Sequence, residues 1–184
     1  MVKSPKILLG VTGSINIATI FVYISALQSE LQCRMHIMMT PAAQSFIPAS
    51  TLIHSIDGDV FVDLSAKGDF KMPHVELTHW ADAIVVLPAS ANTIAKVAHG
   101  FAQDIVSSTI LCANSPVIFL PSMYLGMWHK PSVKRNINQL REDGYHVYPA
   151  LDATSTGNER MGGALPAPQT AASYVKQILT KSSD

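Results

Sequence analysis

Short apolar runs alternate along this chain with segments whose apolar residues recur at helical spacing. A short, continuous apolar run bounded by turn residues is typical of a strand buried in a parallel sheet. Five such runs predict five strands: KILLGVTG (6–13), CRMHIMMT (33–40), AIVVLPAS (83–90), PVIFLP (116–121) and YHVYPA (145–150). Helical spacing and helix-start signals predict helices over residues 14–31, from Pro41 onward, and over 76–82, 91–113, 132–144 and 169–181.

This alternation predicts an α/β fold, a Rossmann-like (flavodoxin-like) doubly wound parallel sheet that forms a single domain over residues 1–184. Ser14 can cap the first helix, and Pro41 occupies a first helical position, where its missing N–H costs nothing. Gly144 is expected to end the helix that precedes it. Residues 51–73 are less regular, and AKGDFKMP (66–73) is expected to form a loop.

Composition adds an expectation about assembly. Apolar residues make up 48% of the chain and charged residues only 14%, which leaves much surface that another subunit could cover. We therefore expect a homo-oligomer, with an unusually apolar monomer as the alternative. The formal net charge is zero, so nothing in the charge favours a nucleic-acid partner.

The cysteines and the apolar runs bear on cellular location. Cys33 and Cys112 lie inside apolar segments, which predicts two buried free thiols in a reducing compartment. The first residues read as a strand and not as a signal peptide. No apolar run approaches the roughly 18 residues that span a bilayer. We expect a cytoplasmic protein with no membrane partner.

Candidate chemistry gathers at the ends of the predicted strands. In doubly wound sheets, ligands bind outside the carboxyl ends of the strands. The segments that follow four of them are small and hydroxylated: TGSI (12–15), TPAA (40–43), PASANT (88–93) and PSMY (121–124). Such segments at helix starts suit a phosphate, although G-x-G-x-x-G and P-loop patterns are both missing. The alternative, that Ser14, Thr40 and Ser90 are ordinary helix caps, stays open.

The seven histidines do not form a metal-binding pattern. His74 and His79 are five residues apart, which takes them off one helical face, so no metal site is expected. His74 follows Pro73 at the start of a short predicted helix. There it could serve as a base near neutral pH, or it could be an ordinary surface or capping histidine.

Two segments carry a family resemblance: PHVELTHWADAIVVLPASANTIAKVAHGFAQDIVSST (73–109) and PSMYLGMWHKP (121–131). Together they resemble the homo-oligomeric flavin-containing cysteine decarboxylases. That family includes lantibiotic-type peptidyl-cysteine decarboxylases and phosphopantothenoylcysteine decarboxylases. The resemblance implies an enzyme that binds FMN, or FAD, through Gly13, Ser14, Ile15, Asn16, Thr40, Pro41, Ala42, Phe46, Ser90, Ala91, Asn92, Thr93 and Ser122.

The resemblance also implies the remaining roles. His74 matches the active-site histidine, and residues 121–131 would form a substrate clamp, with contacts from Met123, Tyr124, Met127 and Trp128. The reaction would oxidise the substrate thiol with hydride passing to the flavin, and loss of carbon dioxide would then leave an enethiol. Relatives form trimers or dodecamers with active sites between subunits, so the same is expected here.

Two departures from the family pattern narrow the substrate. The family motif reads P-x-M-N-x-x-M-W, and Tyr124 stands in place of its asparagine, which helps to bind the substrate carboxylate in relatives. Phosphopantothenoylcysteine decarboxylases carry a late cysteine that returns a proton, but this chain has no cysteine after Cys112. We therefore expect a peptide with a C-terminal cysteine, as in aminovinyl-cysteine formation on a ribosomally made peptide. Phosphopantothenoylcysteine, or a catalytically silent flavin-binding role, is the alternative.

A late segment, residues 153–168, is rich in glycine and proline, with Gly157, Gly162 and Gly163 among its members. This composition is expected of a flexible flap that could close over the end of a peptide. A plain surface loop would have the same composition, and the sequence leaves both interpretations open.

Overall fold

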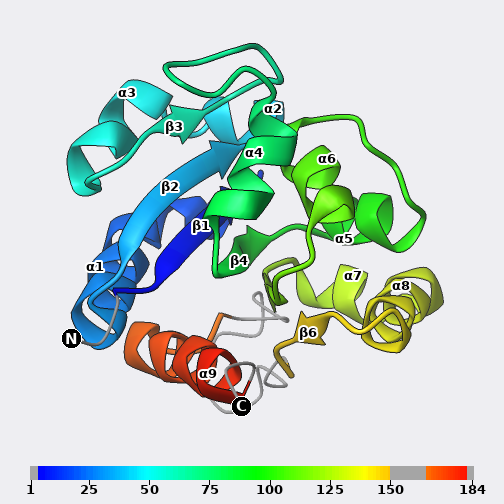
Figure 1. The fold of residues 1–184 in the computed structure, drawn as a ribbon. Helices are drawn as coiled ribbons and strands as arrows, with labels where there is room; N and C mark the ends of the chain where they lie inside the picture. Colours follow the sequence, from blue (N-terminus) through cyan, green and yellow to red (C-terminus); the bar gives the residue numbers. More distant parts are fainter. Residues whose placement is uncertain (1–3, 150–164, 182–184) are drawn as a thin grey trace.

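A six-stranded parallel sheet forms the centre of the molecule. The computed structural model describes residues 4–149 and 165–181. The strands are β1 (Lys6–Val11), β2 (Arg34–Met39), β3 (Val60–Phe61), β4 (Ala83–Ala89), β5 (Val117–Pro121) and β6 (His146–Val147). They lie in the order β3-β2-β1-β4-β5-β6, and every pairing is parallel. The doubly wound α/β fold expected from the sequence is confirmed (Figure 1).

Helices cover both faces of the sheet and bury its apolar strands. Alternate residues of β1 point to opposite faces of the sheet. Ile7 and Leu9 pack into one core cluster, and Leu8 packs into the other. The first cluster contains α1 (Ile20–Leu31) and α9 (Pro168–Lys181), which lie side by side. The helices of the second cluster are α4 (Pro73–Trp80), α5 (Ala91–Ala98), α6 (Ile105–Cys112) and α8 (Pro131–Glu142).

The strand β3 is a sixth strand beyond the five predicted, and it lies in the less regular region 51–73. That region contains α3 (Ala49–Leu52), a 3-10 helix (Ile53–Ser55) and the two residues of β3. Two residues are too few to give an apolar run. The backbone N–H of Asp59 donates to Nδ1 of His36 at 2.7 Å, a contact that supports β3 beside β2. No local pattern reveals this contact, because its partners are distant in sequence.

The long helical region predicted over 91–113 consists of two helices, because the chain breaks after α5. Gly100 adopts a positive φ of 70°, a left-handed conformation that glycine adopts without strain. Asp104 then begins α6 with a capping box: its side chain accepts the N–H of Ser107, and the Ser107 hydroxyl accepts the N–H of Asp104. A capping acid inside an apolar pattern marks a new helix.

Two other helix predictions also differ in detail. Residues 14–31 form a 3-10 helix (Ile15–Thr19) followed by α1, and the side chain of Ser14 caps neither. The helix from Pro41 is the short α2 (Pro41–Gln44), with Pro41 at its start as expected. The stop at Gly144 is confirmed, since that residue follows α8 with a φ of 88°.

The two cysteines are free, as predicted, but they are not both buried. Cys33 is partly buried and Cys112 is exposed at the last position of α6. An apolar segment therefore does not guarantee that each of its residues faces the core. Across the described ranges, no helix has both the length and the apolar character needed to cross a bilayer.

Most of the predicted flap over 153–168 falls outside the described residues. The described part begins at Leu165, which is partly buried against the first core cluster. The hydroxyl of Tyr23 on α1 donates to the carbonyl of Pro166 at 2.7 Å. This contact fixes the approach to α9.

Candidate active site

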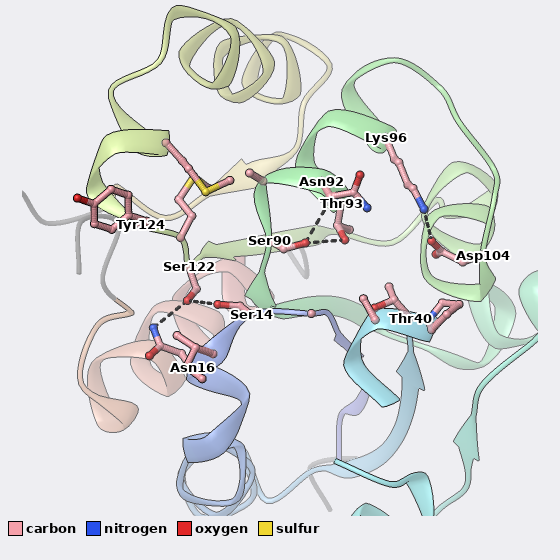
Figure 2. Close-up of a pocket in the computed structure, with 17 residues that line it drawn as sticks. Ser14, Asn16, Thr40, Ser90, Asn92, Thr93, Lys96, Asp104, Ser122 and Tyr124 are labelled. Carbon is pink, nitrogen blue, oxygen red and sulfur yellow. Dashed lines mark hydrogen bonds and ion pairs between the residues drawn. The ribbon is translucent and has the colours of Figure 1, made fainter. Parts of the chain in front are cut away.

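A cavity of about 490 Å³ opens at the carboxyl edge of the sheet. It lies where β1 and β4 are neighbours while the chain continues outward in opposite directions, the position at which doubly wound sheets bind ligands. Its volume is within the range of small-molecule sites. The cavity is lined by Gly13, Ser14, Ile15, Asn16, Thr40, Pro41, Ala42, Ser90, Ala91, Asn92, Thr93, Lys96, Asp104, Ser122, Met123, Tyr124 and Met127 (Figure 2).

Thr12 joins the ends of the two central strands beside this cavity. Its buried hydroxyl donates to the carbonyl of Pro88 at 2.5 Å and accepts the N–H of Ser90 at 2.9 Å. The segment after β4 is thereby held against the end of β1. Thr12 was not predicted to have a role of its own.

A second polar cluster joins the segments that follow β1 and β5. The hydroxyls of Ser14 and Ser122 lie 2.8 Å apart, and Nδ2 of Asn16 donates to Oγ of Ser122, also at 2.8 Å (Figure 2). Ser122 is only 1% exposed, and its N–H donates to the carbonyl of Ala89. Ser14 therefore contributes to the cavity wall and is not the helix cap that was the alternative.

The ends of β1 and β2 approach each other closely at the cavity. A Cβ atom at Gly13 would stand 2.6 Å from the Cβ of Ala42. Contacts this short do not occur between real Cβ atoms, so only glycine allows the two segments to lie this close.

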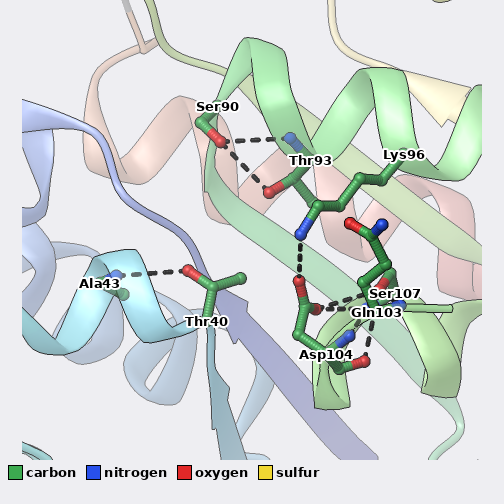
Figure 3. Close-up of polar contacts among 8 residues, drawn as sticks. All are labelled: Thr40, Ala43, Ser90, Thr93, Lys96, Gln103, Asp104 and Ser107. Carbon is green, nitrogen blue, oxygen red and sulfur yellow. Dashed lines mark hydrogen bonds and ion pairs between the residues drawn. The ribbon is translucent and has the colours of Figure 1, made fainter. Parts of the chain in front are cut away.

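Thr40 and Ser90 have both of the roles considered for them. Each accepts the N–H of the residue three positions later, Ala43 and Thr93 respectively, at 3.3 Å. They cap α2 and α5 and also line the cavity (Figure 3). The start of α5 therefore faces this space, and a helix N-terminus favours an anionic ligand.

An ion pair that sequence reasoning missed lies in the cavity wall. Nζ of Lys96 on α5 donates to Oδ2 of Asp104 at 2.8 Å, and their side chains are 20% and 5% exposed (Figure 3). Burial alone would raise the pKa of Asp104, but the hydrogen bonds from Lys96 and Ser107 outweigh it and hold that pKa below its usual value. Lys96 lies four residues after Asn92, so helical spacing could have indicated that it faces the same space.

Apolar side chains form the other part of the cavity wall. Ile15, Tyr124 and Met127 are 63%, 59% and 45% exposed, although they are large and apolar. Tyr124 precedes the one-turn helix α7 (Leu125–Trp128) inside the predicted clamp. Trp128 does not line the cavity but packs against the second core cluster, and Phe46 is exposed and also lies outside the lining.

His74 does not line the cavity of this chain. It occupies the first turn of α4, after Pro73. Because α4 runs back toward the start of β4, this turn lies at the carboxyl edge of the sheet, the edge that carries the cavity. Nδ1 of His74 is buried and has no hydrogen-bond partner in the described chain. Among the described residues, no three His, Cys, Asp or Glu side chains are grouped as metal ligands.

The sequence matches a known family over almost its whole length. The family model described as Flavoprotein matches residues 1–180. The chain is 33% identical over 175 residues to mersacidin decarboxylase from Bacillus sp. (strain HIL-Y85/54728), a match that covers 93% of this chain and 89% of that protein. It is 34% identical over 146 residues to the coenzyme A biosynthesis bifunctional protein CoaBC of Bacillus subtilis (strain 168), covering 79% of this chain but only 36% of the longer protein.

Solved structures agree with this match. The FMN-dependent cysteine decarboxylase SpaF superimposes with a TM-score of 0.83 at 31% identity, covering 98% of each chain. A variant of EpiD in complex with the substrate peptide DSYTC superimposes with a TM-score of 0.79 at 25% identity, covering 95% of this chain and 99% of the other.

Proposed function

Because this chain belongs to the Flavoprotein family, we propose that it is an FMN-dependent decarboxylase that acts on a C-terminal peptidyl cysteine. The observation that carries the proposal is the cavity at the β1–β4 switch point. Of the residues that the family resemblance assigns to the flavin, all but Phe46 line this one space: 13–16, 40–42, 90–93 and Ser122.

The residues present fit FMN. Its phosphate needs several hydrogen-bond donors, and Ser14, Asn16 and Ser122 form a cluster of hydroxyl and amide groups in one part of the cavity. The start of α5 at Ser90 adds backbone N–H groups with a favourable dipole. FAD presents the same ring and first phosphate and is the alternative cofactor.

When bound, FMN supplies the hydride-accepting step that turns the cysteine thiol into a thioaldehyde, whose neighbouring carboxylate can then leave as carbon dioxide. The residues of the chain orient the peptide and handle its protons. His74 would take the proton of the substrate thiol. Met123, Tyr124 and Met127 would cover the reacting end of the peptide and exclude water, which strengthens the polar contacts inside.

The complete site would need a second copy of the chain. His74 lies outside the cavity of its own chain, although both are at the same edge of the sheet. Ile15, Met72 and Phe101 are each more than half exposed, and apolar surface of this kind is typically covered by another subunit. A homo-oligomer, a trimer or a dodecamer, would place His74 of one subunit beside the cavity of another.

Several observations favour a peptide over phosphopantothenoylcysteine. The solved relative EpiD binds a peptide that ends in cysteine, and mersacidin decarboxylase matches along most of its length. The late proton-returning cysteine of the phosphopantothenoylcysteine enzymes has no counterpart after Cys112. The product would then be the free enethiol that forms an aminovinyl-cysteine ring. A cytoplasmic location remains a prediction from the two free thiols.

The test uses the purified protein and two substrates. A yellow protein that converts a Cys-ending peptide to a product lighter by carbon dioxide and two hydrogen atoms would support the proposal. Loss of carbon dioxide alone from the peptide would rule out the oxidative route. Turnover of phosphopantothenoylcysteine without turnover of any peptide would favour the coenzyme A pathway instead. His74→Asn should retain FMN but lose turnover; full activity would remove His74 from the mechanism.

A further inference from the structure

The Lys96–Asp104 ion pair supplies the only charged side chains among the described residues that line the cavity. All other described lining residues are neutral. Figure 2 shows the pair on one side of the cavity and the Ser14–Asn16–Ser122 cluster on the other, with Thr40 and Thr93 between them. The cavity therefore has a neutral donor end and a charged end.

Asp104 is fixed in place from several directions. Its Oδ1 accepts the N–H of Ser107 at 2.9 Å and lies 3.1 Å from the Ser107 hydroxyl, which donates to it, while Oδ2 accepts from Lys96. The carboxylate is 5% exposed, so rotation toward solvent would break these contacts. Its position is therefore determined by the start of α6, whether or not Lys96 is present.

Asp104 therefore fixes the position of the positively charged ammonium group of Lys96. An ammonium group has three N–H donors, and Asp104 accepts one of them. The side chain is 20% exposed and forms part of the cavity wall. A pair that merely joined α5 to α6 would not need to face the cavity, and α6 already has its cap from Asp104 and Ser107.

We propose that Lys96, held by Asp104, stabilises the negative charge that the bound flavin carries after reduction. The inference rests on the proposed function. Transfer of a hydride from the cysteine Cβ to the flavin, with the thiol proton taken by a base, leaves a negative charge on the flavin. A cation fixed in the cavity wall would favour that reduced form of a flavin bound there, because charge near the ring nitrogens is a recognised means of tuning flavin electronics. Asp104 is the positioning residue in this scheme, and Lys96 acts through its charge and does not transfer a proton.

The test compares four variants of the FMN-loaded protein by the midpoint potential of the bound flavin. Lys96→Met keeps the length of the side chain and removes the charge. We expect the ratio of reduced to oxidised flavin at a fixed potential to fall about tenfold or more, which for a two-electron couple is a potential about 30 mV lower. Lys96→Arg keeps the charge and should stay close to the parent.

Asp104→Asn should shift the midpoint potential of the bound flavin in the opposite direction from Lys96→Met. Asparagine caps helices as well as aspartate does, so α6 keeps its start, but the negative charge beside Lys96 is gone. The potential should therefore rise. A purely structural brace would not produce opposite shifts in the two variants. Lys176→Met, which breaks an exposed ion pair with Glu30 between α9 and α1, should leave the potential unchanged.

The outcomes separate the inference from the proposed function. A parent protein that binds no FMN would overturn both. A parent that binds FMN, with variants of unchanged potential, would overturn the inference alone, even if their melting temperatures fall. If Lys96→Met loses FMN altogether, the rise expected for Asp104→Asn still decides: an unchanged or lower potential in that variant contradicts a role for the charge.

Discussion

The ring of Tyr124 lies so close to Gly126 that a Cβ atom at Gly126 would stand 2.8 Å from Cε1 of that ring. Gly126 is in the middle of the one-turn helix α7, where alanine would be the better helix former by roughly 1 kcal/mol. Gly126 therefore leaves room for the ring of Tyr124 and does not favour the helix. Tyr124, which departs from the family motif, and Gly126 act as one unit beside the cavity.

The first prediction concerns this unit. Gly126→Ala should push the ring away from its position and change KM for a Cys-ending peptide by about tenfold, while the melting temperature and the FMN content stay the same. In a Tyr124→Ala background, where no ring is present, Gly126→Ala should have no effect on KM. Equal effects in both backgrounds would show that the ring is not what Gly126 accommodates.

The second prediction concerns Tyr124 itself. Tyr124→Asn restores the family residue and should alter turnover of the peptide without altering FMN content, because residue 124 lies beside the reacting end of the substrate in the proposed site. The measurement is kcat and KM with one Cys-ending peptide. Turnover equal to that of the parent would mean that residue 124 does not orient the substrate carboxylate.

The sequence predicted the central strands because each is a continuous apolar run. The rule that ligands bind outside the carboxyl ends of parallel strands then predicted that Ser14, Ser90 and Ser122 lie near one another. It could not place Lys96 and Asp104 together. Their contact depends on the break after α5, where Gly100 turns the chain back. The apolar spacing continues across that break, so it predicts one helical region and not two helices that face each other. Long-range contacts made by a local irregularity leave little trace in periodicity.

The third prediction tests the close approach of β1 and β2. Gly13→Ala places a methyl group 2.6 Å from the Cβ of Ala42, and overpacking of this kind typically costs about 1–3 kcal/mol. We expect a lower unfolding free energy and a lower fraction of bound FMN. The double variant Gly13→Ala/Ala42→Gly removes the clashing methyl and should recover part of both. Failure of the second change to restore either quantity would assign the loss to backbone conformation instead.

The fourth prediction concerns the hydroxyl at the centre of the donor cluster. Ser122→Ala leaves Ser14 and Nδ2 of Asn16 without their partner. Loss of a hydrogen-bonding group in a buried site costs about 1–3 kcal/mol, so the Kd for FMN should rise about tenfold or more. Titration of the apoprotein by quenching of flavin fluorescence measures it. Ser132→Ala, exposed on α8, is the matched control and should leave the Kd unchanged.

The last prediction is a pH dependence of stability that originates at His36. Burial lowers the pKa of this histidine, which packs against Phe61, Phe70 and Trp80 and accepts the N–H of Asp59 at Nδ1. The unfolded chain takes up a proton near pH 6.5, and the folded chain resists it until a lower pH, so unfolding binds protons in that window. The contribution to stability is fully present above pH 6.5 and is lost as the pH falls through the folded pKa.

His36→Asn isolates this effect, because Oδ1 of asparagine can accept the Asp59 N–H but does not titrate. The variant should be less stable than the parent at pH 8, since it loses the ring contacts, by about 1–3 kcal/mol. Its urea midpoint should nevertheless fall less steeply than that of the parent as the pH falls below about 6.5. His54→Asn, at an exposed position, should keep the slope of the parent. If the urea midpoints of the parent and of His36→Asn fall equally steeply with pH, another group causes the pH dependence.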